Sequence, residues 1–345
     1  MALVDTARPP QAGWLRSQEF DLALICGLTA VALAAGGLIA MAPAAIGLIM
    51  LVDAWILGSP HVLATLFRVA PDQAGLRQHR FLIFVLPLIV LAVVTGIALS
   101  AGIVLIATIY FYWQWYHTLR QSWGVSQLYR RRSPVPVGDS PFVAEGLFTL
   151  VALWGLLHRL TTAPEYFLFP SLPIAVPHVP AWLADGVGVL AVLGLAYWGF
   201  ARLREWMAGE LPLAHTLFSA SHFVIFIVGY VVMDDIVGGW LVTNIWHTAQ
   251  YLMLVWMFNQ NAVAKAQGTP RGWFFRATRG NKAPIYFGLC IAAAFPLYFA
   301  INSAFLWGAT GVFIAVIANQ TLNFHHFIVD AVIWRARRKP AGTPA

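Results

Sequence analysis

Long apolar stretches alternate with short polar or basic segments along nearly the whole chain. An α-helix needs about 20 apolar residues to cross a bilayer, so the pattern predicts an all-α, polytopic transmembrane bundle of roughly ten spans. We place the spans at residues 20–40, 43–69, 80–101, 103–129, 141–160, 182–203, 212–233, 236–260, 284–301 and 304–334. Because we find neither an internal repeat nor a change of composition, residues 1–345 are expected to form one membrane domain, with short tails at 1–19 and 335–345.

The composition agrees with this prediction. Hydrophobic residues make up 60% of the chain and charged residues only 10%, which leaves too little polar surface to cover a soluble globule. Cys26 and Cys290 both lie in apolar stretches and fit no zinc or redox spacing, so we expect small core residues rather than a disulfide. The N-terminus lacks the short apolar region and cleavage site of a signal peptide.

The net charge of +7 is concentrated at the ends of the even-numbered spans. The basic residues there are Arg68, Arg77, Arg80, Arg130, Arg131, Arg132, Arg202, Arg204, those of residues 265–282, Arg335, Arg337, Arg338 and Lys339. By the positive-inside rule these ends are cytoplasmic, which puts both termini in the cytoplasm, and we expect a bacterial inner membrane. Such a distribution excludes nucleic acid as a partner. The basic and aromatic segment 265–282 is either an ordinary cytoplasmic loop or one that lies on anionic head groups.

Four histidines lie inside apolar spans that all run toward the basic ends: His61, His117, His247 and His326. Counted back from those ends at 1.5 Å per residue, each lies at a depth of roughly 10–20 Å. Ionisable side chains inside a membrane are costly and usually face a site or a cavity. Four parallel helices therefore bring four imidazoles to one layer.

Polar residues accompany these histidines at helical spacing. The stripes are Gln114, His117 and Gln121; Asn244, His247 and Gln250; and Asn319, Asn323, His326 and Asp330, with Asp53 on a face similar to that of His61. A polar stripe on an apolar helix must face the bundle interior. Neutral imidazole suits iron, copper and zinc, and amide or carboxylate neighbours can accept its other ring N–H. A single intramembrane histidine is more often an interhelical hydrogen-bonding group, but four at one depth favour a shared metal site.

The remaining histidines are weaker candidates. His325 points about 100° away from His326, so it is either a ligand of another ion or an interhelical hydrogen-bonding group. His222 is a reserve ligand with an equally good packing role. We expect His79, His158 and His178 to be solvated at span ends or in a loop, and His215 lies too near a span start to assign.

Four short segments in order along the chain resemble the bacteriorhodopsin-related-protein (Brp/Blh) family of membrane carotene oxygenases. They are GSPHVLATLFR, YHTLRQSWG, IWHTAQYL and NFHHFIVDAVIW. The resemblance implies non-haem iron and O₂ chemistry on a lipid-soluble substrate, with iron on His61, His117 and His247. The chain departs from the family at Tyr251, which stands where the family has a second histidine, and His326 is then the best replacement ligand.

Together these observations predict a mononuclear Fe²⁺ centre on four imidazoles, in an O₂-dependent oxygenase, hydroxylase or desaturase that acts on an apolar lipid or isoprenoid. Asp330 is expected to support His326, and Tyr251 either bonds a bound oxygen species or stabilises the bundle. Four aromatic residues either line a lipid-accessible pocket or simply pack the bundle: Trp113, Trp115, Trp246 and Phe324. The histidine boxes of di-iron desaturases and alkane hydroxylases are absent.

Two other classes of protein remain open. A haem-binding electron-transfer or sensor protein would use paired imidazoles as axial ligands. A proton-coupled transporter would use Asp53, Asp330 and the polar stripes, but the inverted repeats and broken helices that favour this class are not found in the sequence.

Overall fold

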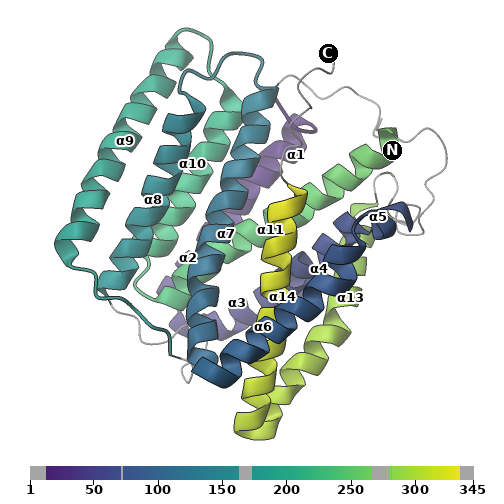
Figure 1. Ribbon diagram of the computed structural model, residues 1–345. Helices are drawn as coiled ribbons and strands as arrows, with labels where there is room; N and C mark the ends of the chain where they lie inside the picture. Colours follow the sequence, from purple (N-terminus) through teal and green to yellow (C-terminus); the bar gives the residue numbers. More distant parts are fainter. Residues whose placement is uncertain are drawn as a thin grey trace.

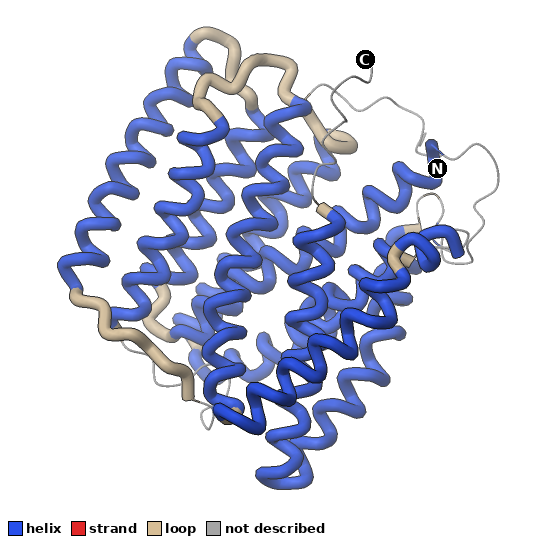
Figure 2. The backbone as a smooth tube through the Cα atoms, in the orientation of Figure 1, coloured by secondary structure: helices blue, strands red, loops and turns tan. Residues whose placement is uncertain are grey.

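The computed structural model describes residues 13–70, 73–162, 173–265, 278, 280 and 282–334. Helices make up most of this part of the chain, and none of it is a strand (Figure 2). The all-α prediction is therefore confirmed.

The helices, apart from the short α5, follow the predicted apolar stretches closely. In the first half of the chain they are α1 (Gln18–Leu22), α2 (Leu28–Met41), α3 (Ile46–Val52), α4 (Ser59–Val69), α5 (Gln73–Gln78), α6 (Leu86–Ala101), α7 (Ile103–Arg132) and α8 (Pro141–Thr161). In the second half they are α9 (Ala181–Met207), α10 (Leu213–Ile227), α11 (Ile236–Lys265), α13 (Ala283–Ser303) and α14 (Gly308–Ile333). Gly102, at a φ of +84°, lies between α6 and α7 and lets the chain reverse there, because glycine has no Cβ to clash.

Several helices are extended by π-helical turns that the apolar pattern did not predict. These turns are η1 (Ala23–Gly27), η3 (Asp53–Gly58), η4 (Phe81–Val85) and η5 (Val228–Val232), and short 3₁₀ turns are η2 (Pro43–Ala45) and η6 (Ala304–Trp307). A π turn changes which carbonyl accepts each backbone hydrogen bond, and such turns are frequent at functional sites. One of them, η3, directly precedes the helix that carries His61.

Seven helical segments in the described part of the chain are long and apolar enough to cross a membrane. They are Gln18–Met41, Pro43–Val69, Phe81–Ala101, Pro141–Thr161, Ala181–Met207, Leu213–Val232 and Ala283–Ile333, the last of which contains both α13 and α14. These segments indicate a membrane protein, but they do not confirm the predicted ten spans. The two 30-residue helices α7 and α11, which carry polar stripes, are not among the seven.

The exterior of the bundle is apolar. Leu99 on α6, Leu193 on α9 and Phe299 on α13 each expose more than half of their surface. Such a surface suits contact with lipid rather than with water. Cys290 is buried as expected, whereas Cys26 is exposed because it lies on an outward face of η1, so the expectation of a core position is wrong for Cys26. Both thiols are free.

The four helices with the candidate histidines surround one another. In Figure 1, α8, α9 and α10 form one side of the molecule and α6 and α13 the other. Between them, α11 contacts both α4 and α7, and α14 also contacts both α4 and α7. The ring formed by α4, α7, α11 and α14 therefore has an interior to which each helix can contribute a side chain.

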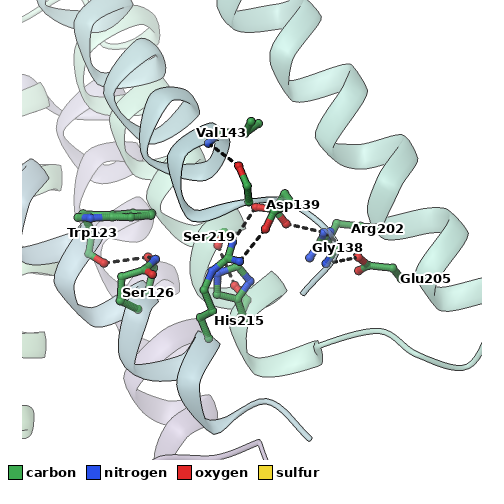
Figure 3. A network of polar contacts seen from close by, with 12 residues as sticks. Trp123, Ser126, Gly138, Asp139, Val143, Arg202, Glu205, His215 and Ser219 are labelled. Atoms are coloured by element: carbon green, nitrogen blue, oxygen red, sulfur yellow. Dashed lines mark hydrogen bonds and ion pairs between the residues drawn. The ribbon is translucent and has the colours of Figure 1, made fainter. Parts of the chain in front are cut away.

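Basic residues gather at one end of the bundle, which we call the basic end. Arg130 near the end of α7 and Arg202 near the end of α9 both bind Asp139, at 2.9 and 2.6 Å. Figure 3 shows the pair formed by Arg202 and Asp139. The Gly13 N–H donates to the carbonyl of Arg132 at 3.0 Å, which holds the segment before α1 at the same end.

The opposite end has a different character. There Arg159, near the end of α8, donates to the backbone carbonyl of Asp234, just before α11 begins, at 2.8 Å. The acidic pair Asp234 and Asp235 lies at this end.

Candidate metal centre

The four predicted histidines converge inside the ring of α4, α7, α11 and α14. His61, His117, His247 and His326 are all buried, with at most 7% of their surface exposed. The centre of the His61 ring lies 4.4 Å from the centre of the His326 ring and 4.9 Å from that of the His247 ring. The centre of the His117 ring lies 5.1 Å from that of the His326 ring and 5.0 Å from that of the His247 ring. The ring centres of His61 and His117 are 6.5 Å apart. The four histidines that the sequence analysis predicted to lie at one depth are therefore neighbours in space.

Three of these side chains lie close enough together that they could hold one ion. His61, His117 and His326 each offer a ring nitrogen, and these nitrogens lie within 4.8 Å of one another. Donor atoms about 2.1 Å from a shared ion are about 3–4 Å apart, so a small inward shift would complete such a site. His247 lies beside this triple and contacts the rings of His61 and His117.

Several polar atoms in this cluster are buried without a hydrogen-bond partner. They are His61 Nδ1, His117 Nε2, His247 Nδ1, His326 Nε2 and Asp330 Oδ2. Most buried polar atoms in proteins are paired, because an unpaired one costs the free energy of its lost hydration. Nitrogen lone pairs and a carboxylate oxygen that share one pocket fit a cation as their common partner.

Asp330 lies closer to the centre than the sequence suggested. Its Oδ2 is 3.9 Å from His117 Nε2 and 3.8 Å from His326 Nε2. These separations are too long for hydrogen bonds, but they suit two donor atoms on one ion. The carboxylate is therefore placed as a candidate ligand and not only as a support for His326.

The other oxygen of Asp330 belongs to a hydroxyl network. Tyr251 donates its phenolic O–H to Asp330 Oδ1 at 2.6 Å. Thr65 Oγ1 lies 2.8 Å from the Tyr251 hydroxyl, 3.5 Å from Asp330 Oδ1 and 2.6 Å from His326 Nδ1. Tyr251 thus positions Asp330, a role that the sequence analysis did not assign to it.

Thr65 was missed by the sequence analysis, although it lies four residues after His61 and so shares its helix face. If His326 Nε2 binds an ion, Nδ1 must carry the proton and donate it to Thr65 Oγ1. Thr65 can then donate its own proton toward Tyr251 or Asp330. In that arrangement the hydroxyl accepts from Nδ1 and supports the tautomer of His326 that has a free Nε2.

A second polar chain lies beside the histidines. Gln114 Nε2 donates to Asn244 Oδ1 at 2.9 Å, and Asn244 Nδ2 donates to Asp53 Oδ2 at 2.6 Å. Gln121 Nε2 donates to the backbone carbonyl of His247 at 3.3 Å. The stripes on α7 and α11 therefore face each other, and Asp53 lies with them.

The residues of the polar stripe on α14 contact two different parts of the bundle. Asn319 Nδ2 donates to Asn302 Oδ1 on α13 at 3.2 Å, and Asn323 donates to Gln320 on its own helix. These amides are half-buried and make contacts outside the cluster. Only His326 and Asp330 from this stripe reach the centre.

The two other histidines named as possible ligands bind elsewhere. His222 Nδ1 lies 2.7 Å from Ser122 Oγ and its Nε2 lies 3.2 Å from the carbonyl of Phe148, so both ring nitrogens are occupied. His325 Nε2 lies 2.7 Å from the carbonyl of Leu82, within the π turn η4. Both are therefore placed as interhelical hydrogen-bonding groups, the alternative role considered for His325.

The remaining histidines lie away from the centre. His178 is exposed in the segment before α9, and His158 and His79 are half-buried near helix ends. His215 is buried near Asp139 at the basic end (Figure 3), and neither of its ring nitrogens has a hydrogen-bond partner.

The aromatic residues proposed to line a pocket have different surroundings. The Trp113 ring stacks on that of Phe324 at 5.1 Å, and Phe327, which the sequence analysis missed, stacks on His117 at 4.4 Å. Trp115 donates to the carbonyl of Ala152, and Trp246 is fully buried near Phe218. Of the four proposed residues, Trp113 and Phe324 therefore belong to the aromatic wall that reaches His117 through Phe327.

Thr65→Val should weaken metal binding while the bundle remains folded. Valine keeps the shape of threonine but removes the hydroxyl that orients His326 and Asp330. Since hydrogen bonds in membranes are worth about 0.6 kcal/mol on average, and more next to charged groups, we expect a loss of affinity of about 3–10-fold. Competition with a chelator measures it. Thr321→Val on α14 is the control, because its hydroxyl bonds only the carbonyl of Ile317 in its own helix; an equal loss in both variants would contradict a role for Thr65.

Comparison of the chain with models of protein families, with curated proteins and with solved structures found no match. The resemblance to the Brp/Blh family therefore depends on the four short motifs alone.

Proposed function

We propose that this protein is an integral membrane enzyme that binds one iron ion and uses O₂ to oxidise an apolar lipid or isoprenoid. The observation that carries the proposal is the convergence of His61, His117 and His326, from three different helices, with ring nitrogens within 4.8 Å of one another. Asp330 and His247 complete the donor set. The activity implied by the four Brp/Blh-like motifs is of the same kind.

In this proposal α7 and α11 cross the membrane together with the apolar helices, which makes ten spans. Their polar stripes face inward, toward each other and toward Asp53. The basic end and both termini lie in the cytoplasm of a bacterium, in line with the positive-inside rule. The metal centre then lies within the membrane, where an apolar substrate can reach it from the lipid.

The donor set favours a divalent metal such as Fe²⁺. Imidazole and carboxylate ligands without thiolate are typical of non-haem iron sites, and iron in such a site supplies the chemistry that activates O₂. The protein supplies the rest. Thr65 holds the tautomer of His326, Tyr251 fixes the orientation of Asp330, and Phe327 covers the ring of His117. These contacts keep the donors in place and exclude water from them.

The geometry disfavours haem. A porphyrin occupies four positions around its iron and leaves two axial ones, so it can take two imidazoles. Here three imidazole nitrogens lie within 4.8 Å of one another, and a carboxylate oxygen lies 3.9 Å from one of them. A haem protein would need a pair of histidines with space for the macrocycle between them.

Metal analysis of the purified protein tests the proposal. We expect about one iron per chain and no Soret band, because the ligands form a single site of nitrogen and oxygen donors. Consumption of O₂ in the presence of candidate apolar substrates would then establish the reaction. An active protein that contains haem, or contains no metal, would exclude the proposed function.

A further inference from the structure

Three helices carry the residues of the metal centre in the same order toward the basic end. On each of α4, α11 and α14, a histidine is followed four residues later by a member of the hydroxyl network. The pairs are His61 and Thr65, His247 and Tyr251, and His326 and Asp330. Because positions i and i+4 share a helix face, the network forms a layer directly next to the imidazoles, on the side of the basic end.

A third layer follows on the same helices. The guanidinium carbon of Arg68 lies 5.9 Å from the centre of the Phe258 ring and 5.5 Å from that of Trp334, and these two rings are 5.0 Å apart. We call Arg68, Phe258 and Trp334 the arginine clamp. It adjoins the hydroxyl layer, because the Tyr251 ring lies 6.2 Å from that of Trp334.

The charge of Arg68 has no counter-charge in the described part of the chain. Arg68 is half-buried, its Nε is buried without a hydrogen-bond partner, and no described carboxylate lies within 4.0 Å of it. Among the residues that the structure describes, the other arginines that are not exposed have acceptors nearby. Arg130 and Arg202 bind Asp139, Arg159 donates to the carbonyl of Asp234, and Arg16 lies near Asp21.

An arginine that lies over two adjoining aromatic rings is well suited to bind an anion. Contact with the rings restricts the guanidinium group on one side and leaves its other N–H groups able to form a bidentate hydrogen-bonded pair with phosphate or carboxylate. The clamp also lies at the end of the bundle where basic residues gather, the level of lipid head groups in a membrane. A half-buried cation without a counter-charge is costly, and a bound anion would remove that cost.

We propose that the arginine clamp binds the phosphate head group of an anionic bilayer lipid. Arg68 lies seven residues after His61 on α4, about 10 Å along the helix, so a lipid bound there would extend its acyl chains beside the metal centre. This site does not depend on the oxygenase proposed above, because it can bind lipid whether or not the centre holds iron.

Thermal unfolding of the full-length protein in detergent tests the site. Added phosphatidylglycerol should raise the unfolding midpoint of the parent, and phosphatidylcholine should raise it much less, because a ligand that binds the folded state stabilises it. In Arg68→Gln the apparent affinity for phosphatidylglycerol should fall about tenfold or more, since a bidentate charge-assisted pair is lost. Arg68→Lys, which keeps the charge, should lose less and serves if the glutamine variant does not fold.

The control is Arg77→Gln, which removes an exposed arginine from α5, the helix that follows α4. It should respond to phosphatidylglycerol as the parent does. Equal losses in the Arg68 and Arg77 variants would show unspecific attraction to anionic lipid and would overturn the proposal. So would a parent that phosphatidylglycerol does not stabilise, or one that inorganic phosphate alone stabilises equally well.

Discussion

Alanine in place of His61, His117 or His326 should reduce the iron content of the purified protein from about one ion per chain to less than about one tenth, because each residue supplies one of the few donors of a single site. Their ligand nitrogens lie within 4.8 Å of one another, so the loss of any one of the three would leave the ion weakly held. His247→Ala should have a smaller effect, because the His247 ring lies beside this triple. Metal analysis together with O₂ consumption measures both effects.

The bundle should remain folded in these variants. The helices that carry the three histidines also pack through extensive apolar contacts, and a single membrane hydrogen bond contributes only about 0.6 kcal/mol on average. Size-exclusion chromatography and circular dichroism check this point. His178→Ala, which removes an exposed histidine outside the bundle interior, is the matched control. Parent-like iron content in two of the three variants would count decisively against a shared site.

Asp330→Asn should lower the affinity for iron by about 10–100-fold, the usual effect of losing a carboxylate at or next to a metal. Asparagine keeps the size of the side chain and can still accept the Tyr251 hydrogen bond, but it presents a neutral amide to His117 and His326. Because Asp330 Oδ2 lies 3.8 Å from His326 Nε2 and 3.9 Å from His117 Nε2, the negative charge is lost next to the ligand nitrogens themselves. Chelator competition gives the affinity, and the spectrum of the cobalt-substituted protein reports whether the ligand set has changed.

Asp185→Asn is the control for the Asp330 variant, since Asp185 is an exposed carboxylate on α9. It should bind iron as the parent does. If Asp330→Asn also matched the parent in both affinity and cobalt spectrum, Asp330 would have no part in the site.

The helices were largely predictable because their signal is local. Apolar stretches predicted at 103–129 and 236–260 are helices at Ile103–Arg132 and Ile236–Lys265, which extend a few residues further into the basic segments. The π turns were not predictable in this way. A turn such as Asp53–Gly58 has the same apolar composition as an α-helix, and only its hydrogen-bonding pattern differs.

The candidate site was predictable in part. The depth of each histidine follows from its distance in residues to the basic end, so the common layer could be inferred from the sequence. The rotation of each helix about its axis could not. His325 and His326 are adjacent, yet one bonds the carbonyl of Leu82 and the other faces the cluster.

The sequence by itself therefore determined that this is a membrane protein, where its helices lie and in which layer the imidazoles lie. Apolar length, charge bias and helical rise are properties of each segment alone. Only the tertiary structure decided which polar atoms meet. The placement of Asp330 near two imidazoles, the Thr65 and Tyr251 hydroxyls on its other oxygen, and Arg68 over two adjoining rings all depend on how α4, α11 and α14 are rotated against one another. That rotation results from the packing of the whole bundle, which no single segment encodes.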